Sequence, residues 1–304
     1  MDQIKSELFK SGFVAVVGRP NVGKSTLVNA LLGQKIAAVS PRPQTTRRKQ
    51  LGILTLEHAQ VVFVDTPGLH VAHHKLGEYM NEEAAATLDD ADVILWLVDI
   101  SGLPTEEDSL IARRLATLKE MPTTLLLLNK TDLLPTDRIS EYQAAYQTLL
   151  PGGLPFLISA ATGQGCPELL HAILNSLPEG QAYYSKDEIT DFFERDIAAD
   201  LIREAALLHL RDEVPHGIAV RIDEFTERGE SGAHISATLF VEKESHKGIV
   251  IGQGGSMLKL IGTTARKEIE GMSGRKVYLE LRVKVNKNWR NNPEALRLMG
   301  YGRD

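Results

Sequence analysis

The stretch FVAVVGRPNVGKST, residues 13–26, joins a short apolar run to a glycine-rich loop. Its second part, GRPNVGKST, matches G-x-x-x-x-G-K-[S/T], a pattern that binds phosphates where a strand runs through the loop into a helix. That setting is present, because FVAVVG is typical of a buried strand and STLVNALLG of a helix. The glycines let the backbone curl, so that successive N–H groups face the phosphates at a helix N-terminus. We therefore predict a nucleotide-binding loop.

The next buried run supplies a second part of the same site. In a loop of this kind Lys24 reaches the β- and γ-phosphates, and the Ser25 hydroxyl ligates Mg²⁺. Asp65 ends the strand VVFVD, where a carboxylate holds Mg²⁺, and the Gly68 N–H meets the γ-phosphate. The predicted phosphate and metal site comprises Gly18, Arg19, Pro20, Asn21, Val22, Gly23, Lys24, Ser25, Thr26, Asp65, Thr66, Pro67 and Gly68.

Two later motifs indicate which base is bound. In NKTD, the Asp132 carboxylate can accept from both N1–H and the N2 amine of guanine, a donor pair that adenine lacks. A site built for this pair rejects a base without it, because its own polar group stays unpaired. Asn129 is expected to brace the loops around the base, and Lys130 to lie over the ring. In SAATG, Ser159 precedes Ala160, whose N–H can donate to guanine O6. These signals together predict a GTPase.

The spacing of apolar runs predicts the fold around these motifs. Up to about residue 178, runs with few polar positions alternate with helical patterns; the runs are 13–18, 61–65, 93–99, 124–130 and 155–159. Strands buried on both faces have this form in parallel sheets covered by helices. LGILTLEH (51–58) alternates more and is predicted to be an antiparallel edge strand. We expect an α/β fold for residues 1–178, a Ras-like P-loop domain with a mostly parallel six-stranded sheet.

The rest of the chain has another order of elements and another charge. After a linker at 179–187, residues 188–304 are predicted to form a separate α+β domain of order αββααβ. Its predicted elements are a helix at 188–211, strands at 217–225 and 234–243, a short helix at 246–251, a helix at 255–270 and a strand at 276–285. From His246 to Asp304 there are 12 Lys and Arg against 5 Asp and Glu, a net +7, whereas the preceding 245 residues hold 22 against 35, a net −13. The basic end is therefore the candidate for a polyanionic partner.

Within the basic end, KGIVIGQGGSMLKLIGTTARKEIE (247–270) contains a GxxG loop between a short and a longer helix. In a KH domain this loop clamps single-stranded nucleic acid, while a neighbouring apolar groove receives the bases. Glycine permits close approach of a phosphate to the backbone. The predicted RNA-binding residues are Lys247, Gly252, Gln253, Gly254, Gly255, Lys259 and Arg266, and the apolar positions expected to build the groove and core are Ile249, Ile251, Leu258 and Ile261.

Taken together, GRPNVGKST, PQTTRR, DTPGL, NKTD and SA resemble the Era branch of the translation-factor-related GTPases, and the resemblance covers the whole chain. It implies GTP and GDP as ligands, Mg²⁺ as the cofactor, slow hydrolysis to GDP and phosphate, and a C-terminal type II KH domain. Members of this family bind the 3′ end of 16S rRNA and act in assembly of the small (30S) ribosomal subunit. The implied partners are therefore this rRNA and the 30S precursor, with peripheral association at the inner membrane.

The residue after the DTPG loop raises the question of how water is positioned. Ras-like GTPases carry a glutamine there that orients the attacking water, but here Leu69 follows Gly68. An apolar side chain cannot orient water. One hypothesis, taken from related GTPases, is that Asn21 coordinates K⁺, which stabilises phosphate charge as an arginine finger does. The alternative is an asparagine that only shapes the loop.

PRPQTTRRKQ, residues 41–50, is the candidate for switch I. A threonine hydroxyl is expected to complete the Mg²⁺ shell in the GTP state, and we favour Thr46, with Thr45 as the alternate. The predicted catalytic set is Asn21, Lys24, Thr46, Asp65 and Gly68. Arg47 and Arg48 are interpreted either as internal stabilisers of phosphate charge or as a basic loop that touches RNA.

Three histidines follow the DTPG loop: His70, His73 and His74. A metal or general-base role is conceivable for such a group. We interpret them as solvated side chains of a flexible switch II, because a free histidine titrates near neutral pH without any special function.

Composition places the chain among ordinary globular proteins. Hydrophobic residues make up 43% and charged residues 24% of its 304 residues, enough for two cores. The single cysteine, Cys166, excludes an internal disulfide and fits a reducing compartment. The N-terminus has no cleavable leader pattern, and no apolar run approaches a membrane span. We expect a cytoplasmic monomer.

Overall fold

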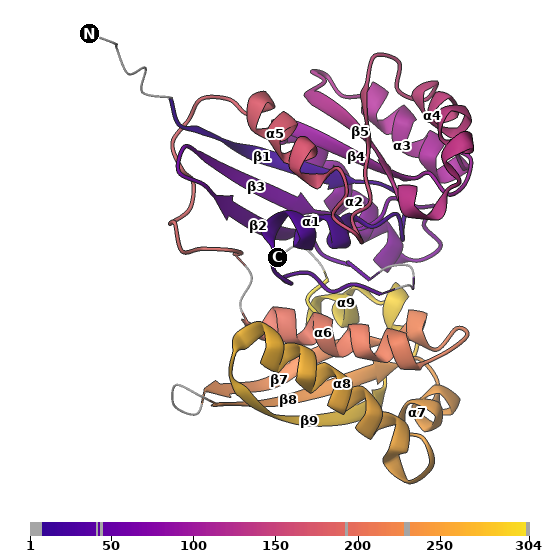
Figure 1. Ribbon diagram of the computed structural model, residues 1–304. Coiled ribbons are helices and arrows are strands. Elements are labelled where there is room, and N and C mark those ends of the chain that lie inside the picture. The colour runs from indigo at the N-terminus through magenta and orange to yellow at the C-terminus, as the bar shows by residue number, and fades with distance from the viewer. Residues whose placement is uncertain (1–7, 41, 43–44, 192–193, 228–231, 302–304) are drawn as a thin grey trace. The chain divides into compact units, whose positions relative to one another are not determined.

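The computed structural model describes residues 8–40, 42, 45–191, 194–227 and 232–301, which form two compact units (Figure 1). The first unit contains the described residues of 1–34, 48–71 and 81–191, and the second those of 35–47, 72–80 and 192–304. Two short segments from the first half of the sequence thus belong to the second unit. They include the described residues of candidate switch I up to Arg47 and the stretch 72–80, which begins shortly after the DTPG loop.

The first unit is built on a six-stranded sheet of order β2-β3-β1-β4-β5-β6. Its strands are β1 (Lys10–Val17), β2 (Gln50–Thr55), β3 (Ala59–Asp65), β4 (Val93–Asp99), β5 (Thr123–Asn129) and β6 (Leu154–Leu157). Among these described strands only β2 pairs antiparallel, with β3, and the other pairs are parallel. The predicted fold class and the antiparallel edge strand are confirmed.

Helices cover this sheet because its central strands are apolar on both faces. Every residue of β3 and β4 is buried. The helices are α1 (Lys24–Leu32), α2 (Lys75–Asp89), α3 (Glu106–Ala116), α4 (Ile139–Gln147) and α5 (Cys166–Ser176), with 3₁₀ turns η1 (Thr131–Leu133) and η2 (Thr136–Arg138). One apolar cluster joins β1, β4 and β5 to α2, α3 and α4. The carboxyl ends of β1, β3, β4 and β5 then meet along one edge, which is where ligands bind in such sheets.

The second unit contains a three-stranded sheet of order β7-β8-β9. Strands β7 (Ala219–Glu227) and β8 (Gly232–Val241) are antiparallel, whereas β8 and β9 (Lys276–Val285) are parallel. With helices α6 (Glu194–His209), α7 (Glu244–Ile251) and α8 (Ser256–Ser273), the order is αββααβ as predicted. Its main core joins the three strands to α6, α7 and α8.

A C-terminal segment adds elements that the sequence reading left out. The 3₁₀ turn η5 (Trp289–Asn291) leads into α9 (Pro293–Leu298), which follows an Asn292 side chain that accepts from the N–H groups of Glu294 and Ala295. An asparagine cap followed by proline is a helix-start signal, so this short helix was predictable. Two further 3₁₀ turns are η3 (Pro215–Gly217) and η4 (Gln253–Gly255).

The segment 179–187, interpreted as a linker, belongs to the first unit and is hydrogen bonded to other residues of that unit. The Gly180 N–H donates to the Phe9 carbonyl, and the Ser11 hydroxyl donates to the Gln181 carbonyl at 2.6 Å. The Gln60 side chain accepts from the Tyr184 N–H and donates to its carbonyl. Within the described part of the chain, every helix is too short or too polar to traverse a bilayer.

Candidate nucleotide site and RNA groove

The phosphate-binding loop closes on a strand end that lies far away in the sequence. The Asn129 side chain donates to the Val22 carbonyl at 2.7 Å and accepts from the Ala160 N–H at 2.9 Å. Gly23 has φ 103°, and a Cβ there would lie 2.4 Å from the Asn129 amide nitrogen. Only glycine allows both this backbone conformation and this approach. One amide therefore joins three of the four predicted nucleotide-binding motifs, GRPNVGKST, NKTD and SA.

Lys24 and Ser25 open helix α1 directly after this loop. The buried Lys24 ammonium donates to the Gly18 and Arg19 carbonyls, both at 3.1 Å. Burial lowers the Lys24 pKa to about 8, against an opposing effect of the Asp65 carboxylate. The Ser25 hydroxyl donates to Asp65 Oδ2 at 2.6 Å. This hydroxyl and this carboxylate are oxygen donors of the kind that Mg²⁺ prefers, so the residues fit the predicted metal.

The DTPG turn packs against the phosphate-binding loop. The Thr66 hydroxyl donates to the Val16 carbonyl at 2.8 Å. A Cβ at Gly68 would lie 2.6 Å from the Pro20 nitrogen, so glycine is required for the contact between the two loops. The remaining predicted residues lie in the same loops or at their helix start: Asn21, Thr26 and Pro67.

Leu69 belongs to the core. Its side chain is 4% exposed and packs in the cluster that includes Val17 and Trp96. Its N–H donates to the Gly18 carbonyl at 3.3 Å. The hydrophobic residue at this position thus packs the start of switch II against the sheet, and its side chain has no polar atom that could orient a water molecule.

The interpretation of the three histidines as solvated is wrong for one of them. His70 is buried, and its Nδ1 lies 2.8 Å from the Gly68 carbonyl oxygen, to which it donates. The Asn81 side chain accepts from the His70 N–H and donates to its carbonyl. His73 is exposed, whereas His74 is half-buried and its Nδ1 accepts from the Gly77 N–H. No sequence pattern indicated this anchoring, because Asn81 lies on the following helix.

At the base end of the site, Lys130 has φ 69°, which turns the chain sharply after β5. Its ammonium forms an ion pair with Asp99 Oδ2 at 2.7 Å. Asp132 is exposed on η1, where its carboxylate can accept from a base, and Ser159 is fully buried next to Ala160. Asp99 was missed from the sequence. Its signal was its place at the carboxyl end of an apolar strand, as for Asp65.

Of the candidate switch I residues, Pro41, Pro43 and Gln44 lie outside the described residues, and Thr45, Thr46 and Arg47 belong to the second unit. Arg47 is 2% exposed and donates to the carbonyls of Ile218, at 2.7 Å, and His216, at 3.1 Å. Burial lowers its pKa to about 10. Both interpretations of Arg47, at a phosphate or in an RNA-touching loop, are wrong for this structure. The roles of Thr46 and Thr45 as metal ligands stay predictions.

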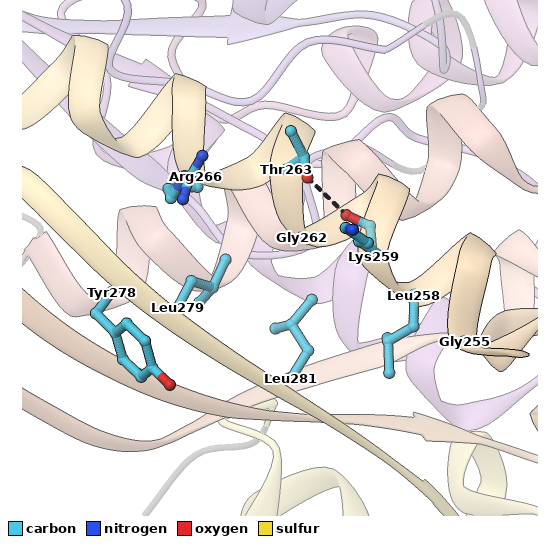
Figure 2. A pocket seen from close by; sticks show the side chains of 9 residues that line it. All are labelled: Gly255, Leu258, Lys259, Gly262, Thr263, Arg266, Tyr278, Leu279 and Leu281. Carbon is cyan, nitrogen blue, oxygen red and sulfur yellow. Dashed lines mark hydrogen bonds between the residues drawn. The ribbon is translucent and has the colours of Figure 1, made fainter.

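The second unit carries an open groove of about 440 Å³ beside the GxxG loop (Figure 2). It lies between α8 and β9 and is lined by Gly255, Leu258, Lys259, Gly262, Thr263, Arg266, Tyr278, Leu279 and Leu281. Three of the predicted RNA-binding residues are among them. The β9 side was not anticipated, although KVYLELRVKV has an apolar residue at every second position. Of the expected apolar positions, Ile261 is core and Ile249 is 49% exposed.

The glycines of the GxxG loop are required for two different reasons. Gly252 has φ 73°, and a Cβ there would lie 2.8 Å from the Met257 N and Cβ atoms. Gly254 and Gly255 have φ 59° and 81° with open space around them. Gln253 is exposed at the tip, and Lys247 is half-buried on α7. The loop thus exposes its backbone to a nucleic-acid strand that approaches the groove.

Comparison with known proteins agrees with this architecture. The family model of the 50S ribosome-binding GTPases matches residues 13–130, and that of the KH domain matches residues 213–290. The GTPase Era of Caldicellulosiruptor saccharolyticus is 46% identical over 297 residues, covering 96% of this chain and 98% of that protein. The GTPase Era of Leuconostoc citreum is also 46% identical over 297 residues, covering 97% of this chain and 98% of its own.

The chain belongs to the Era family of GTPases. Two solved structures of this family superpose with a TM-score of 0.92 at 39% identity, each covering 97% of this chain and 100% of its own. One is Era in complex with MgGDPNP and nucleotides 1506–1542 of 16S ribosomal RNA, and the other is a point variant of Aquifex aeolicus Era bound to GDP·AlF₄⁻. The predictions of a GTPase with GTP, GDP and Mg²⁺, and of a KH domain, are confirmed for this family member.

The burial of Leu69 leads to a testable expectation. Leu69→Gln, which restores the residue type of Ras-like enzymes, places an amide in an apolar cluster and should destabilise the chain by about 2 kcal/mol without raising GTP turnover. Urea unfolding and phosphate release measure the two effects. Leu69→Met, which conserves volume, is the control and should cost less. Faster turnover in Leu69→Gln would contradict the core assignment.

Proposed function

We propose that this family member is a GTP-controlled RNA-binding protein that binds the 3′ end of 16S rRNA through its KH domain and assists assembly of the 30S subunit. The observation that carries the proposal is the open groove beside a GxxG loop, in a chain that is 39% identical to an Era bound to 16S nucleotides 1506–1542. Association with a 30S precursor follows from the same rRNA target.

The nucleotide site supports defined roles for the predicted residues. Lys24 carries a positive charge next to the phosphate-binding loop, and the N–H groups of Gly23 and its neighbours supply fixed donors. Ser25 and Asp65 would hold Mg²⁺, which neutralises charge on the β- and γ-phosphates when bound. Asp132 would accept from guanine, and the aliphatic stem of Lys130 would cover the ring. Thr46 is proposed as the third metal ligand.

Because Leu69 stands where Ras-like GTPases have a water-orienting glutamine, hydrolysis needs another device. One proposal for this site is that Asn21 coordinates K⁺, which stabilises the phosphate charge. Asn21 has φ 64°, a left-handed conformation in which asparagine is enriched, as the loop-shaping alternative requires. It is exposed in the phosphate-binding loop, where a side-chain oxygen can also reach a cation. Both roles fit the geometry, so the distinction needs a variant that keeps the backbone conformation.

Asn21→Gly retains the left-handed conformation and removes the side-chain oxygen. If Asn21 coordinates K⁺, the unmodified chain should hydrolyse GTP at least several-fold faster in KCl than in NaCl, and Asn21→Gly should lose that difference. The measurement is phosphate release at equal ionic strength. Equal rates of the unmodified chain in the two salts would remove the hypothesis.

The groove is suited to binding single-stranded RNA because it combines an apolar floor, exposed backbone of the GxxG loop and positively charged side chains. Leu258, Leu279 and Leu281 offer surface for bases, and Lys259 and Arg266 stand on the exposed side of α8 (Figure 2). Sequence-specific RNA recognition commonly uses unstacked bases in such grooves. Cationic side chains along the rim supply the salt-dependent part of the affinity.

Replacing Gln253 and Gly254 together by Asp should abolish RNA binding, because two carboxylates would face the phosphates. Aspartate is among the residues best tolerated at positive φ, so the loop at Gly254 should keep its conformation. Binding of a labelled strand matching the 16S 3′ end measures the effect. Gly271→Asp, an exposed position near the other end of α8, is the matched control and should bind almost normally. Retained affinity in the double variant would count against the clamp.

Two segments near the nucleotide motifs give a physical basis for coupling RNA affinity to the nucleotide. In the second unit, the Lys35 ammonium forms ion pairs with Glu204 at 3.0 Å and Glu268 at 2.7 Å. Leu76 and Met80 pack in a cluster with Trp289. Lys35 precedes the DTPG motif in the sequence, and Leu76 and Met80 follow it. The segments 35–47 and 72–80 therefore each contain residues that contact the KH domain. We propose that the γ-phosphate, by ordering these segments, changes those contacts.

The coupling proposal predicts that the 16S 3′-end strand binds more tightly with a non-hydrolysable GTP analogue than with GDP, at fixed salt. Binding titrations in both states measure the ratio, and by linkage the strand should tighten analogue binding by the same factor. Equal RNA affinity in the two states would leave an RNA-binding assembly factor whose turnover is incidental. Absence of binding in both states would contradict the RNA target itself.

Cytoplasmic location, a monomeric state and peripheral association with the inner membrane complete the proposal. The first follows from the composition and the reducing environment that a single cysteine suits. Membrane association is carried by the resemblance alone.

A further inference from the structure

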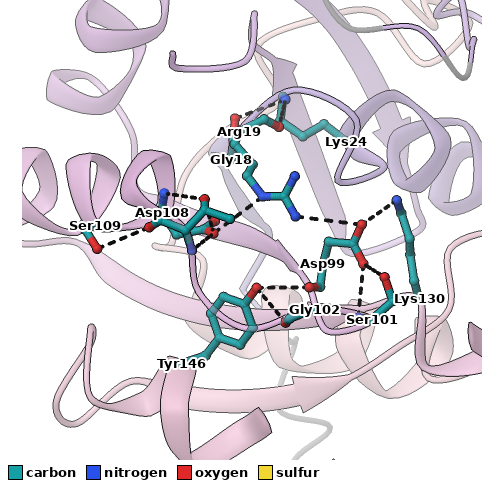
Figure 3. A network of polar contacts seen from close by, with 11 residues as sticks. Gly18, Arg19, Lys24, Asp99, Ser101, Gly102, Asp108, Ser109, Lys130 and Tyr146 are labelled. Atoms are coloured by element: carbon teal, nitrogen blue, oxygen red, sulfur yellow. Dashed lines mark hydrogen bonds and ion pairs between the residues drawn. The ribbon is translucent and has the colours of Figure 1, made fainter. Parts of the chain in front are cut away.

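A network of charged side chains connects the two loops that would hold opposite ends of the nucleotide (Figure 3). Asp99, at the end of β4, lies at its centre. Its Oδ2 atom is 2.7 Å from the Lys130 ammonium and 3.8 Å from an Arg19 guanidinium nitrogen. Its Oδ1 atom accepts from the Ser101 N–H at 3.1 Å and from the Ser101 hydroxyl at 2.6 Å. Both carboxylate oxygens are therefore oriented.

Arg19, the second residue of the phosphate-binding loop, is held by a second carboxylate. Its Nε lies 3.4 Å from Asp108 Oδ2, and Asp108 is fully buried in the first turn of α3. Asp108 is itself fixed, because the Thr105 N–H and hydroxyl donate to the same oxygen at 2.9 and 2.8 Å. Arg19 thus lies between two carboxylates, one at the end of β4 and one in the first turn of α3, on either side of the β4–α3 turn.

The turn is rigidly supported. The Tyr146 hydroxyl lies 2.9 Å from the Asp99 carbonyl and 3.2 Å from the Gly102 carbonyl, and Tyr146 is fully buried. Burial raises the Tyr146 pKa, so the hydroxyl remains a donor at neutral pH. Burial alone would raise the pKa of the Asp99 carboxyl group. Hydrogen bonds from Lys130 and Ser101 outweigh this effect and hold the Asp99 pKa below its ordinary value. Asp99 therefore stays charged throughout the neutral range.

We propose that Asp99 is a positioning residue of the nucleotide site, whose one carboxylate anchors both Lys130 of the base-recognition loop and Arg19 of the phosphate-binding loop. The inference rests on the proposed contact between Lys130 and guanine. The Lys130 ammonium is directed to Asp99, so its aliphatic stem is held in one orientation for the base. Loss of the anchor leaves the stem mobile, and ordering it again on binding costs affinity.

The test compares Asp99→Asn, Lys130→Met and the double variant. Asparagine keeps the shape and the hydrogen bond to Ser101, and methionine keeps an apolar stem without the ammonium. Each single variant should weaken GDP and GTP-analogue binding by about tenfold, as expected for losing one charge-assisted hydrogen bond. The double variant should be no weaker than Asp99→Asn alone, because Asp99→Asn already removes the ion pair that Lys130→Met removes. The loss should appear in KM more than in kcat.

Two outcomes would overturn the proposal. One is an Asp99→Asn variant with unchanged nucleotide affinity, and the other is an additive loss of about a hundredfold in the double variant. Asp89→Asn removes an exposed carboxylate that pairs with Arg114 in the same unit and is the matched control, expected to bind normally. An unmodified chain that bound ADP as tightly as GDP would instead refute the proposed base contact.

Thermal unfolding of the nucleotide-free variants measures how much stability each substitution costs. A loss of stability alone does not make the affinity losses of two substitutions non-additive. The two measurements together therefore separate positioning from a general structural role. If Asp99→Asn fails to fold, Lys130→Arg decides the question without changing the carboxylate. An arginine keeps a charged partner for Asp99, so its affinity should lie closer to the unmodified chain than that of Lys130→Met. Equal weakness of the two Lys130 variants would overturn the proposal.

Discussion

The side-chain amide of Asn129 is the interaction on which the nucleotide site depends. It donates to the Val22 carbonyl in the phosphate-binding loop and accepts from the Ala160 N–H after β6. Three loops that are distant in the sequence are held at hydrogen-bond length by one planar group. The approach is possible only because Gly23 has no Cβ to occupy the space of the amide nitrogen. A residue usually associated with the base is therefore also a structural tie to the phosphate end.

The parallel sheet explains why these loops meet. Its buried strands are apolar along most of their length and carry a carboxylate or an amide at their carboxyl ends, at Asp65, Asp99 and Asn129. Ion pairs and hydrogen bonds between these ends and the phosphate-binding loop take place in partly buried surroundings, where solvent screens them little. Leu69 fits this arrangement because it begins switch II with an apolar contact to the sheet. The second unit differs, since its groove lies between helix α8 and strand β9, beside the glycines of the GxxG loop.

Much of the fold and the candidate site could be predicted from the sequence. Each described strand overlaps a predicted one, the buried strands of the first unit through their apolar runs and β2 through an alternating pattern. Lys24, Ser25, Asp65 and Asn129 followed from motifs whose spacing carries the chemistry. Interactions made across the fold could not be predicted. The anchoring of His70 by Asn81, the burial of Arg47 against backbone carbonyls and the Asp99 network all join residues whose separation in sequence carries no pattern. Helix α9 is a different case, because its asparagine and proline signals were present.

By itself, the sequence determined the class of the protein: two domains, a guanine-nucleotide loop set and a GxxG loop in a basic module. These features are local, because glycine conformations, strand periodicity and motif spacing are properties of short stretches of chain. Only the tertiary structure decided which charged groups share partners, and that the segments 35–47 and 72–80 belong to the second unit. The physical reason is that a side chain's burial and its partners depend on what packs against it. A short sequence pattern contains no information about those neighbours.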